Sequence, residues 1–68
     1  MNIKIYDFTK PELDFFRSQC NFLDDELEYF NLRSRGASNV EIALKMHVSE
    51  AKVSKLARKV KDKIIRVV

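Results

Sequence analysis

Residues 38–58 constrain the fold of this chain more than any other stretch. Ser38 and Glu41 have the S-x-x-E spacing of a capping box, in which a hydroxyl and a carboxylate each bind one free backbone amide at a helix start. A helix is predicted over residues 38–46. Its inward positions carry apolar or small side chains, namely Ile42, Ala43 and Met46. The stretch therefore begins with a short amphipathic helix that leaves room for a close neighbour.

The second half of this stretch predicts a tight turn and another helix. His47 falls in the turn, and Ser49 has the position of a second N-cap. The helix predicted over residues 49–66 keeps apolar residues at helical spacing, namely Val53, Leu56, Val60 and Ile64. Two short helices that cross steeply over a turn of about three or four residues form a helix-turn-helix.

Positive charge is concentrated on the last predicted helix. The 68 residues carry a formal net charge of +3. From Glu50 onward, Asp62 is the other acidic residue, and seven residues are basic: Lys52, Lys55, Arg58, Lys59, Lys61, Lys63 and Arg66. This region therefore has a net charge of +5, and the rest of the chain has −2. A basic strip on one helix is typical of proteins that bind a phosphate backbone, and the alternative is a solvated lysine face that aids solubility.

Length and composition indicate one small intracellular domain. A chain of 68 residues has room for a single modest core. Cys20 is the only cysteine, so no intramolecular disulfide is possible, and a reducing compartment is favoured. No apolar run approaches the length of a membrane span or a signal peptide. We therefore expect a cytoplasmic protein without a membrane partner.

The N-terminal region predicts an extended arm followed by a helix. The predicted arm covers residues 1–8, and residues 2–8 alternate apolar and polar side chains, which is typical of a short extended arm or an edge strand. Such a strand cannot form a sheet alone, so the arm must pack on the helices or pair with another chain. Thr9 and Glu12 form a capping box at the start of a helix predicted over residues 9–20.

Residues 23–35 predict the remaining helix. Asn21 or Asp24 is expected to cap it, and the acidic residues of its first turn suit the positive end of the helix dipole. Its expected inner stripe is Leu23, Leu27 and Phe30. Gly36 ends it in the left-handed conformation that glycine adopts at little cost. The predicted fold is all-α, a single four-helix helix-turn-helix domain with a short extended N-terminal arm.

Seven features from Leu23 to Ile64 occur in the same order in known DNA-binding domains. They are Glu26 to Glu28, Leu32–Arg33, Gly36, Ser38, Glu41–Ile42–Ala43, Val48–Ser49 and Val53–Ser54. In this pattern the chain resembles region four of bacterial sigma factors, and it is similar also to the effector domain of LuxR-type response regulators. It departs from both families at the turn glycine, where it has His47, and at the threonine-rich start of the recognition helix, where it has Glu50–Ala51–Lys52.

The resemblance implies that the helix over residues 49–66 enters the major groove of double-stranded DNA. The residues that it places at base edges are Ala51, Lys52 and Lys55. Lysine donates to guanine O6 and N7, and an alanine methyl can contact a thymine methyl. The residues that it places at phosphates are Ser38, Asn39, Ser49, Ser54, Arg58 and Lys59. Glu50 either accepts from cytosine N4 or caps its own helix. Arg33 and Arg35 either reach a flanking phosphate or balance the C-terminal end of their helix.

Catalytic and metal sites are not expected. A nucleophile–base pair would need Cys20 and His47, and packing or turn geometry already accounts for both. One cysteine and one histidine also fall short of a zinc site. The adjacent carboxylates of residues 24–28 are explained by their place at a helix start. We therefore expect no enzyme activity, no cofactor and no metal.

The sequence thus predicts a small, sequence-specific double-stranded DNA-binding transcription regulator that acts as a homodimer. The alternative is a helix-turn-helix scaffold used as a protein-interaction module, which binds RNA polymerase or another regulator. Phe15 and Phe16 are consecutive, so both cannot face one small core, and one is expected to be available to a partner. The dimer interface is expected in residues 1–22, with the C-terminal apolar residues as the alternative, namely Ile64, Ile65, Val67 and Val68.

Overall fold

The protein is all-helical, as predicted. A computed structural model describes residues 3–68, and Met1 and Asn2 lie outside the described residues. Its elements are a single 3-10 turn η1 (Ile5–Asp7) and the helices α1 (Lys10–Gln19), α2 (Asp24–Ser34), α3 (Asn39–Met46) and α4 (Glu50–Val67). Within residues 3–68, no helix is both long enough and apolar enough to cross a membrane.

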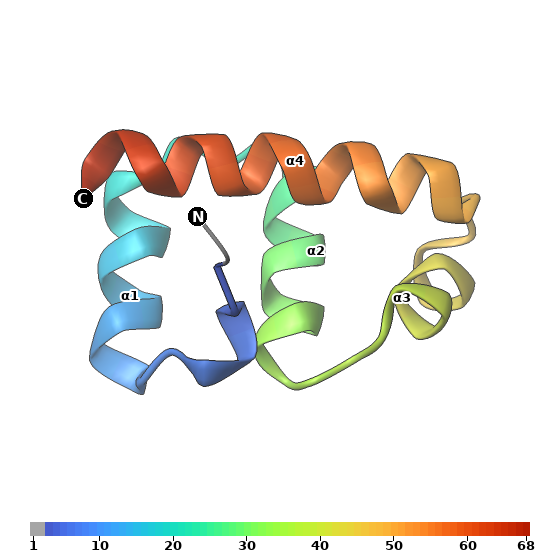
Figure 1. The fold of residues 1–68 in the computed structure, drawn as a ribbon, viewed down its shortest axis with the longest axis horizontal. Helices are drawn as coiled ribbons and strands as arrows, with labels where there is room; N and C mark the ends of the chain where they lie inside the picture. The colour runs from blue at the N-terminus through green and yellow to red at the C-terminus, as the bar shows by residue number, and fades with distance from the viewer. Residues whose placement is uncertain (1–2) are drawn as a thin grey trace.

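Helix α4 organises the other elements. It contacts α1, α2 and α3, and Figure 1 shows it lying across one end of α1 and of α2, with α3 beneath its first turns. Its inner face is fully apolar and buried, with Val53, Leu56, Val60 and Ile64. Burying apolar side chains of this kind contributes about 1.5–3 kcal/mol each, so α4 supplies much of the stability of a domain this small.

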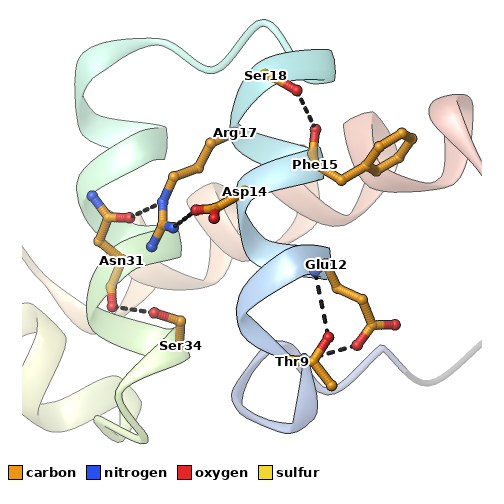
Figure 2. Close-up of polar contacts among 8 residues, drawn as sticks. All are labelled: Thr9, Glu12, Asp14, Phe15, Arg17, Ser18, Asn31 and Ser34. Atoms are coloured by element: carbon orange, nitrogen blue, oxygen red, sulfur yellow. Dashed lines mark hydrogen bonds and ion pairs between the residues drawn. The ribbon is translucent and has the colours of Figure 1, made fainter.

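Local capping fixes where the helices begin. Glu12 N–H donates to Thr9 Oγ1 at 3.4 Å, and Thr9 N–H donates back to Glu12 Oε1 at 2.8 Å, which Figure 2 shows at the start of α1. Ser38 and Glu41 exchange the same two bonds at 3.2 Å each at the start of α3. Both predicted capping boxes are therefore formed, and each is worth about 1 kcal/mol.

The turn between α3 and α4 depends on a left-handed residue. His47 has φ 57° and ψ 44°. The Val48 amide donates to the Ala43 carbonyl at 3.0 Å, and the His47 amide donates to the Leu44 carbonyl at 3.4 Å. This pair of bonds is a Schellman motif, which glycine usually completes. A histidine therefore closes the turn at a position that costs a non-glycine residue about 1 kcal/mol or more.

Two expectations for α2 are wrong. Leu23 is its N-cap and is 60% exposed, while Glu26 and Tyr29 join Phe30 on the buried face. Glu26 can take an inward position because its carboxylate is satisfied there, in part by the Leu23 N–H at 3.0 Å. That bond also caps the helix, so neither Asn21 nor Asp24 is the N-cap.

The N-terminal arm is not an edge strand. Residues 5–7 form one 3-10 turn, and Ile5 is buried in the core against α2. The ring centroid of Phe8 lies 4.9 Å from that of Phe16 on α1. The arm packs on the helices because a lone apolar strand has no ladder partner, whereas Ile5 gains a buried site.

Arg17 links α1 to α2. Its Nε donates to Asn31 Oδ1 at 2.9 Å, and its Nη1 lies 3.2 Å from Asp14 Oδ1 (Figure 2). Its guanidinium also lies over the ring of Phe30. Figure 2 shows the Phe15 ring pointing away from this network. Phe15 is exposed and Phe16 is buried, as their adjacency predicts.

Candidate nucleic-acid interface

The exposed face of α4 carries four of the nine residues that the sequence predicts to contact DNA. Because successive helical residues point about 100° apart, the side opposite the buried apolar stripe is set by the helix itself. That side carries Ala51, Ser54, Lys55, Arg58 and Asp62, all of which are exposed. Two cations and one hydroxyl are therefore presented together, and one carboxylate lies toward the C-terminal end.

The start of α3 lies beside this face of α4. Asn39, the first residue of α3, lines a shallow groove of about 440 Å³ together with Ser54, Arg58 and Lys61 of α4. The structure thus brings together three residues predicted to contact phosphates, Asn39, Ser54 and Arg58. The groove is also lined by Asp62, so its two cations, Arg58 and Lys61, share it with one carboxylate.

Ser38 and Ser49 serve as caps in the structure. Ser38 Oγ accepts from the Glu41 amide at 3.2 Å, and Ser49 Oγ accepts from the Lys52 amide at 3.1 Å. Both residues are exposed. Because a hydroxyl has one proton to donate in addition to its lone pairs, each serine can cap its helix and still donate to a phosphate oxygen.

Lys52 does not point freely outward. Its ammonium lies 3.7 Å from Asp25 Oδ2 in the first turn of α2, and the two side chains are 47% and 44% exposed. Lys59, seven residues further along α4, is close enough to Glu26 to favour the ionised carboxylate. Lys52 therefore faces the acidic start of α2, and Lys59 adds positive charge near it.

The pairing of α4 with α2 was not predicted from the sequence. Lys52, Lys59 and Lys63 fall on one side of α4 because their spacings of seven and four residues are close to whole turns. The first turn of α2 supplies Asp24, Asp25 and Glu26. A lysine row at helical spacing and an acidic helix start are both visible in the sequence, and together they are a signal for such a contact.

Glu26 and Lys63 form the buried ion pair between α2 and α4. Glu26 is 2% exposed, and its carboxylate binds the Lys63 ammonium directly. Lys63 Nζ also donates to the Asn21 carbonyl at 2.7 Å. Burial alone would raise the pKa of Glu26, but hydrogen bonds from Lys63 and the Leu23 amide, together with nearby positive charge, hold that pKa below its ordinary value.

Cys20 and His47 lie near opposite ends of α4. The Cys20 thiol lies 3.6 Å from the Lys63 carbonyl, whereas His47 precedes the first turn of α4. Burial raises the pKa of the Cys20 thiol, so it is protonated at neutral pH. Since α4 rises about 1.5 Å per residue, the two side chains are too far apart to act on one substrate atom.

Arg33 has a structural role at the C-terminal end of α2. Its Nη1 donates to the Ala37 carbonyl at 2.8 Å, just beyond the C-terminal end of α2. Its guanidinium carbon lies 5.2 Å from the centroid of the Tyr6 ring in the arm. Arg33 therefore ties the end of α2 to the arm and satisfies a loop carbonyl, while Arg35 remains exposed.

An exposed apolar pair lies next to the interface. Val40 and Leu44 occupy positions one turn apart on α3 and are 52% and 71% exposed. The spacing of four residues places both on one side of the helix. Nothing in the helix-turn-helix pattern requires apolar residues there, and no role for them was predicted from the sequence.

Comparisons of this chain with protein-family models, with curated proteins and with solved structures found no match.

Proposed function

We propose that the protein binds double-stranded DNA in a sequence-specific manner and regulates transcription. The observation that carries the proposal is the groove shared by Asn39 of α3 with Ser54 and Arg58 of α4. These donors come from the two helices of a helix-turn-helix, on the side where α4 is exposed. This is the arrangement in which one helix reads bases and the preceding helix contacts the backbone.

Base reading is assigned to the first half of α4. The Lys55 ammonium donates to guanine O6 and N7, and the Ala51 methyl contacts a thymine methyl. Lys52 can also donate to a base edge, once its ammonium has left the Asp25 carboxylate. Glu50 is exposed in the first turn of α4, where the helix dipole favours a carboxylate.

Phosphate contacts flank this reading surface. They are assigned to six residues: Ser38, Asn39, Ser49, Ser54, Arg58 and Lys59. All six are exposed. They fix the register of α4 on the duplex and carry no sequence information themselves. The proposed activity needs no cofactor, metal or catalytic step, and a transcription regulator of this kind acts in the cytoplasm.

A salt titration tests the proposal. Binding of the protein to a fluorescent random duplex is measured by anisotropy at several salt concentrations. We expect a dissociation constant between about 1 and 100 µM that weakens steeply with salt. Arg58→Gln should weaken binding to every sequence and lower the salt slope by about one unit. Lys10→Gln, an equal charge loss at the exposed start of α1, is the control and should leave the slope unchanged. Absence of binding even at low salt would refute the proposal.

We also propose that the regulator is a homodimer, because two half-sites give the specificity that a single helix seldom achieves. Within residues 3–8 the arm forms a 3-10 turn with Ile5 buried, so we assign the interface to side-chain packing in a groove and not to strand pairing. A groove of about 430 Å³ is lined by residues of both predicted dimer interfaces. Ile3 and Phe8 come from the N-terminal region, and Ile64 and Val68 come from the C-terminal apolar residues.

The occupant assigned to this groove is a second copy of the chain. Its lining also includes one cation and two carboxylates, Lys4, Asp7 and Glu12. A twofold axis places the same surface opposite itself, so each Lys4 can meet a carboxylate of the other copy. Charge self-complementarity of this kind favours a symmetric dimer over an unrelated partner.

A second function is favoured by one observation, the exposed pair of Val40 and Leu44. In this alternative, α3 docks on RNA polymerase or another regulator, and the helix-turn-helix is a scaffold. The variant Val40→Ser/Leu44→Ser separates the two functions. Loss of regulation with DNA affinity unchanged supports the protein-interaction role, whereas equal loss of both assigns the pair to the DNA interface.

A further inference from the structure

Lys52 has two possible anionic partners. The first is Asp25, whose Oδ2 lies 3.7 Å from the Lys52 ammonium. The second is DNA, if α4 enters the major groove as proposed above. Lys52 lies in the first turn of α4, where a recognition helix approaches base edges. Its four-carbon stem allows the ammonium to reach either partner, but one ammonium cannot serve both fully.

The side of α4 that carries Lys52 contacts α2 further along as well. Lys63 binds the buried Glu26 carboxylate, and Lys59 lies close enough to favour its ionised form. The contact between Lys52 and Asp25 is therefore the exposed end of a row of contacts that fixes the acidic start of α2 against α4. Asp25 stays in place when Lys52 moves, because α2 is held by the buried pair.

We infer that Asp25 is a specificity-determining residue that competes with DNA for Lys52. The inference rests on the proposed DNA-binding function and deepens it. On random duplex, an ion pair with a phosphate is little more favourable for Lys52 than its ion pair with the Asp25 carboxylate. Lys52 therefore stays with Asp25. Only a guanine at the correct position, which accepts through both O6 and N7, draws Lys52 away. Asp25 thereby lowers non-specific affinity and leaves affinity for the correct site largely intact.

Four proteins test the inference on fluorescent random duplex at low salt: wild type, Asp25→Asn, Lys52→Gln, and the double variant. Asp25→Asn should bind about two- to fivefold more tightly, the equivalent of one exposed ion pair. Its salt slope should steepen by about 0.9, because the freed lysine releases one more counterion. Lys52→Gln should weaken binding of the Asp25→Asn protein more than binding of wild type, so the gain of Asp25→Asn should be absent in the double variant.

Asp24→Asn is the matched control. Asp24 is the neighbouring acidic residue in the same first turn. Asp24→Asn therefore changes the net charge and the interaction with the helix dipole by the same amount as Asp25→Asn. Asp24 forms no ion pair within residues 3–68. Asp24→Asn should therefore tighten binding less than twofold. Circular dichroism should show the same helical content in wild type and in both variants.

The two ways to fail are distinguishable. If wild-type protein binds random duplex but Asp24→Asn and Asp25→Asn tighten binding equally, net charge alone is responsible and the inference is overturned. The same conclusion follows if Lys52→Gln weakens binding equally with and without Asp25. If wild-type protein does not bind at low salt, the DNA-binding proposal fails first, and the inference falls with it.

Discussion

Glu26 in the first turn of α2 is bound to Lys63 near the C-terminal end of α4, 37 residues away in the sequence. The carboxylate is buried, and the ammonium also donates to the Asn21 carbonyl that precedes α2. One ion pair thus closes the loop between α1 and α2 against α4. A pair of this kind is worth little relative to an apolar pair of equal size, but loss of one partner is costly.

Lys63→Met should destabilise the domain by about 3 kcal/mol, because it leaves the buried Glu26 carboxylate without its cation. That is a large share of the total stability of a chain this small. The additional change Glu26→Leu should recover most of the loss, since both charges are then gone. Urea unfolding followed by circular dichroism measures both effects.

The control for this prediction is Asp14→Asn, which removes the exposed pair with Arg17 and should cost less than about 1 kcal/mol. Equal losses in Lys63→Met and Asp14→Asn would contradict a special role for the buried pair. A double variant less stable than Lys63→Met alone would show that Glu26 and Lys63 support the core chiefly by their shape.

The same pair predicts how stability depends on pH. The pKa of Glu26 is lower in the folded protein than its ordinary value. Its contribution is therefore fully present above the unfolded-state pKa and is lost as the pH falls through the folded-state pKa. Urea unfolding from about pH 7 down to about pH 2.5 should show a loss below about pH 4.3 that is smaller in Glu26→Gln. A variant with the wild-type pH profile would exclude Glu26 as the titrating group.

Much of the fold follows from short-range signals in the sequence. The capping boxes of Thr9 and Ser38 join residues only three positions apart, so the sequence alone reveals both partners. The ends of α2 and α3 depend on left-handed residues, Gly36 with φ 88° and His47 with φ 57°. The left-handed conformation of Gly36 is predictable because glycine adopts it at little cost. The place of His47 in the turn is predictable from the spacing of the two helices on either side of it.

The errors arise where a distant residue decides the outcome. The inner face of α2 was misassigned because an acidic residue is normally exposed, and only Lys63 makes the buried position of Glu26 favourable. Likewise, the alternation of the arm is typical of a strand, but Ile5 finds a site against α2 that local sequence does not show. For the candidate interface, Lys52 was predicted to point outward because Asp25 is not near it in the sequence.

Ala43 tests the helix-turn-helix register directly. It is buried on α3, which packs against α4, and it is the smallest residue on that face. Ala43→Leu should therefore overpack this face and destabilise the protein by about 1–3 kcal/mol. Ala51→Leu adds the same atoms at an exposed position of α4 and should stay within about 0.5 kcal/mol of wild type. Thermal melting compares the two, and equal melting temperatures would contradict the close approach of α3 to its neighbours.

Charge reversal at the N-terminal groove tests the homodimer. Lys4→Glu makes every charged residue that lines the groove acidic, so two copies related by a twofold axis should repel each other. Adding Asp7→Lys restores one cation and two carboxylates in the groove and should restore the dimer. Both residues are exposed, so neither change should alter the fold. Sedimentation equilibrium measures the dimer constant of wild type and both variants. An unchanged constant in Lys4→Glu would exclude this groove as the interface, and a wild-type protein that stays monomeric at all concentrations would exclude the homodimer itself.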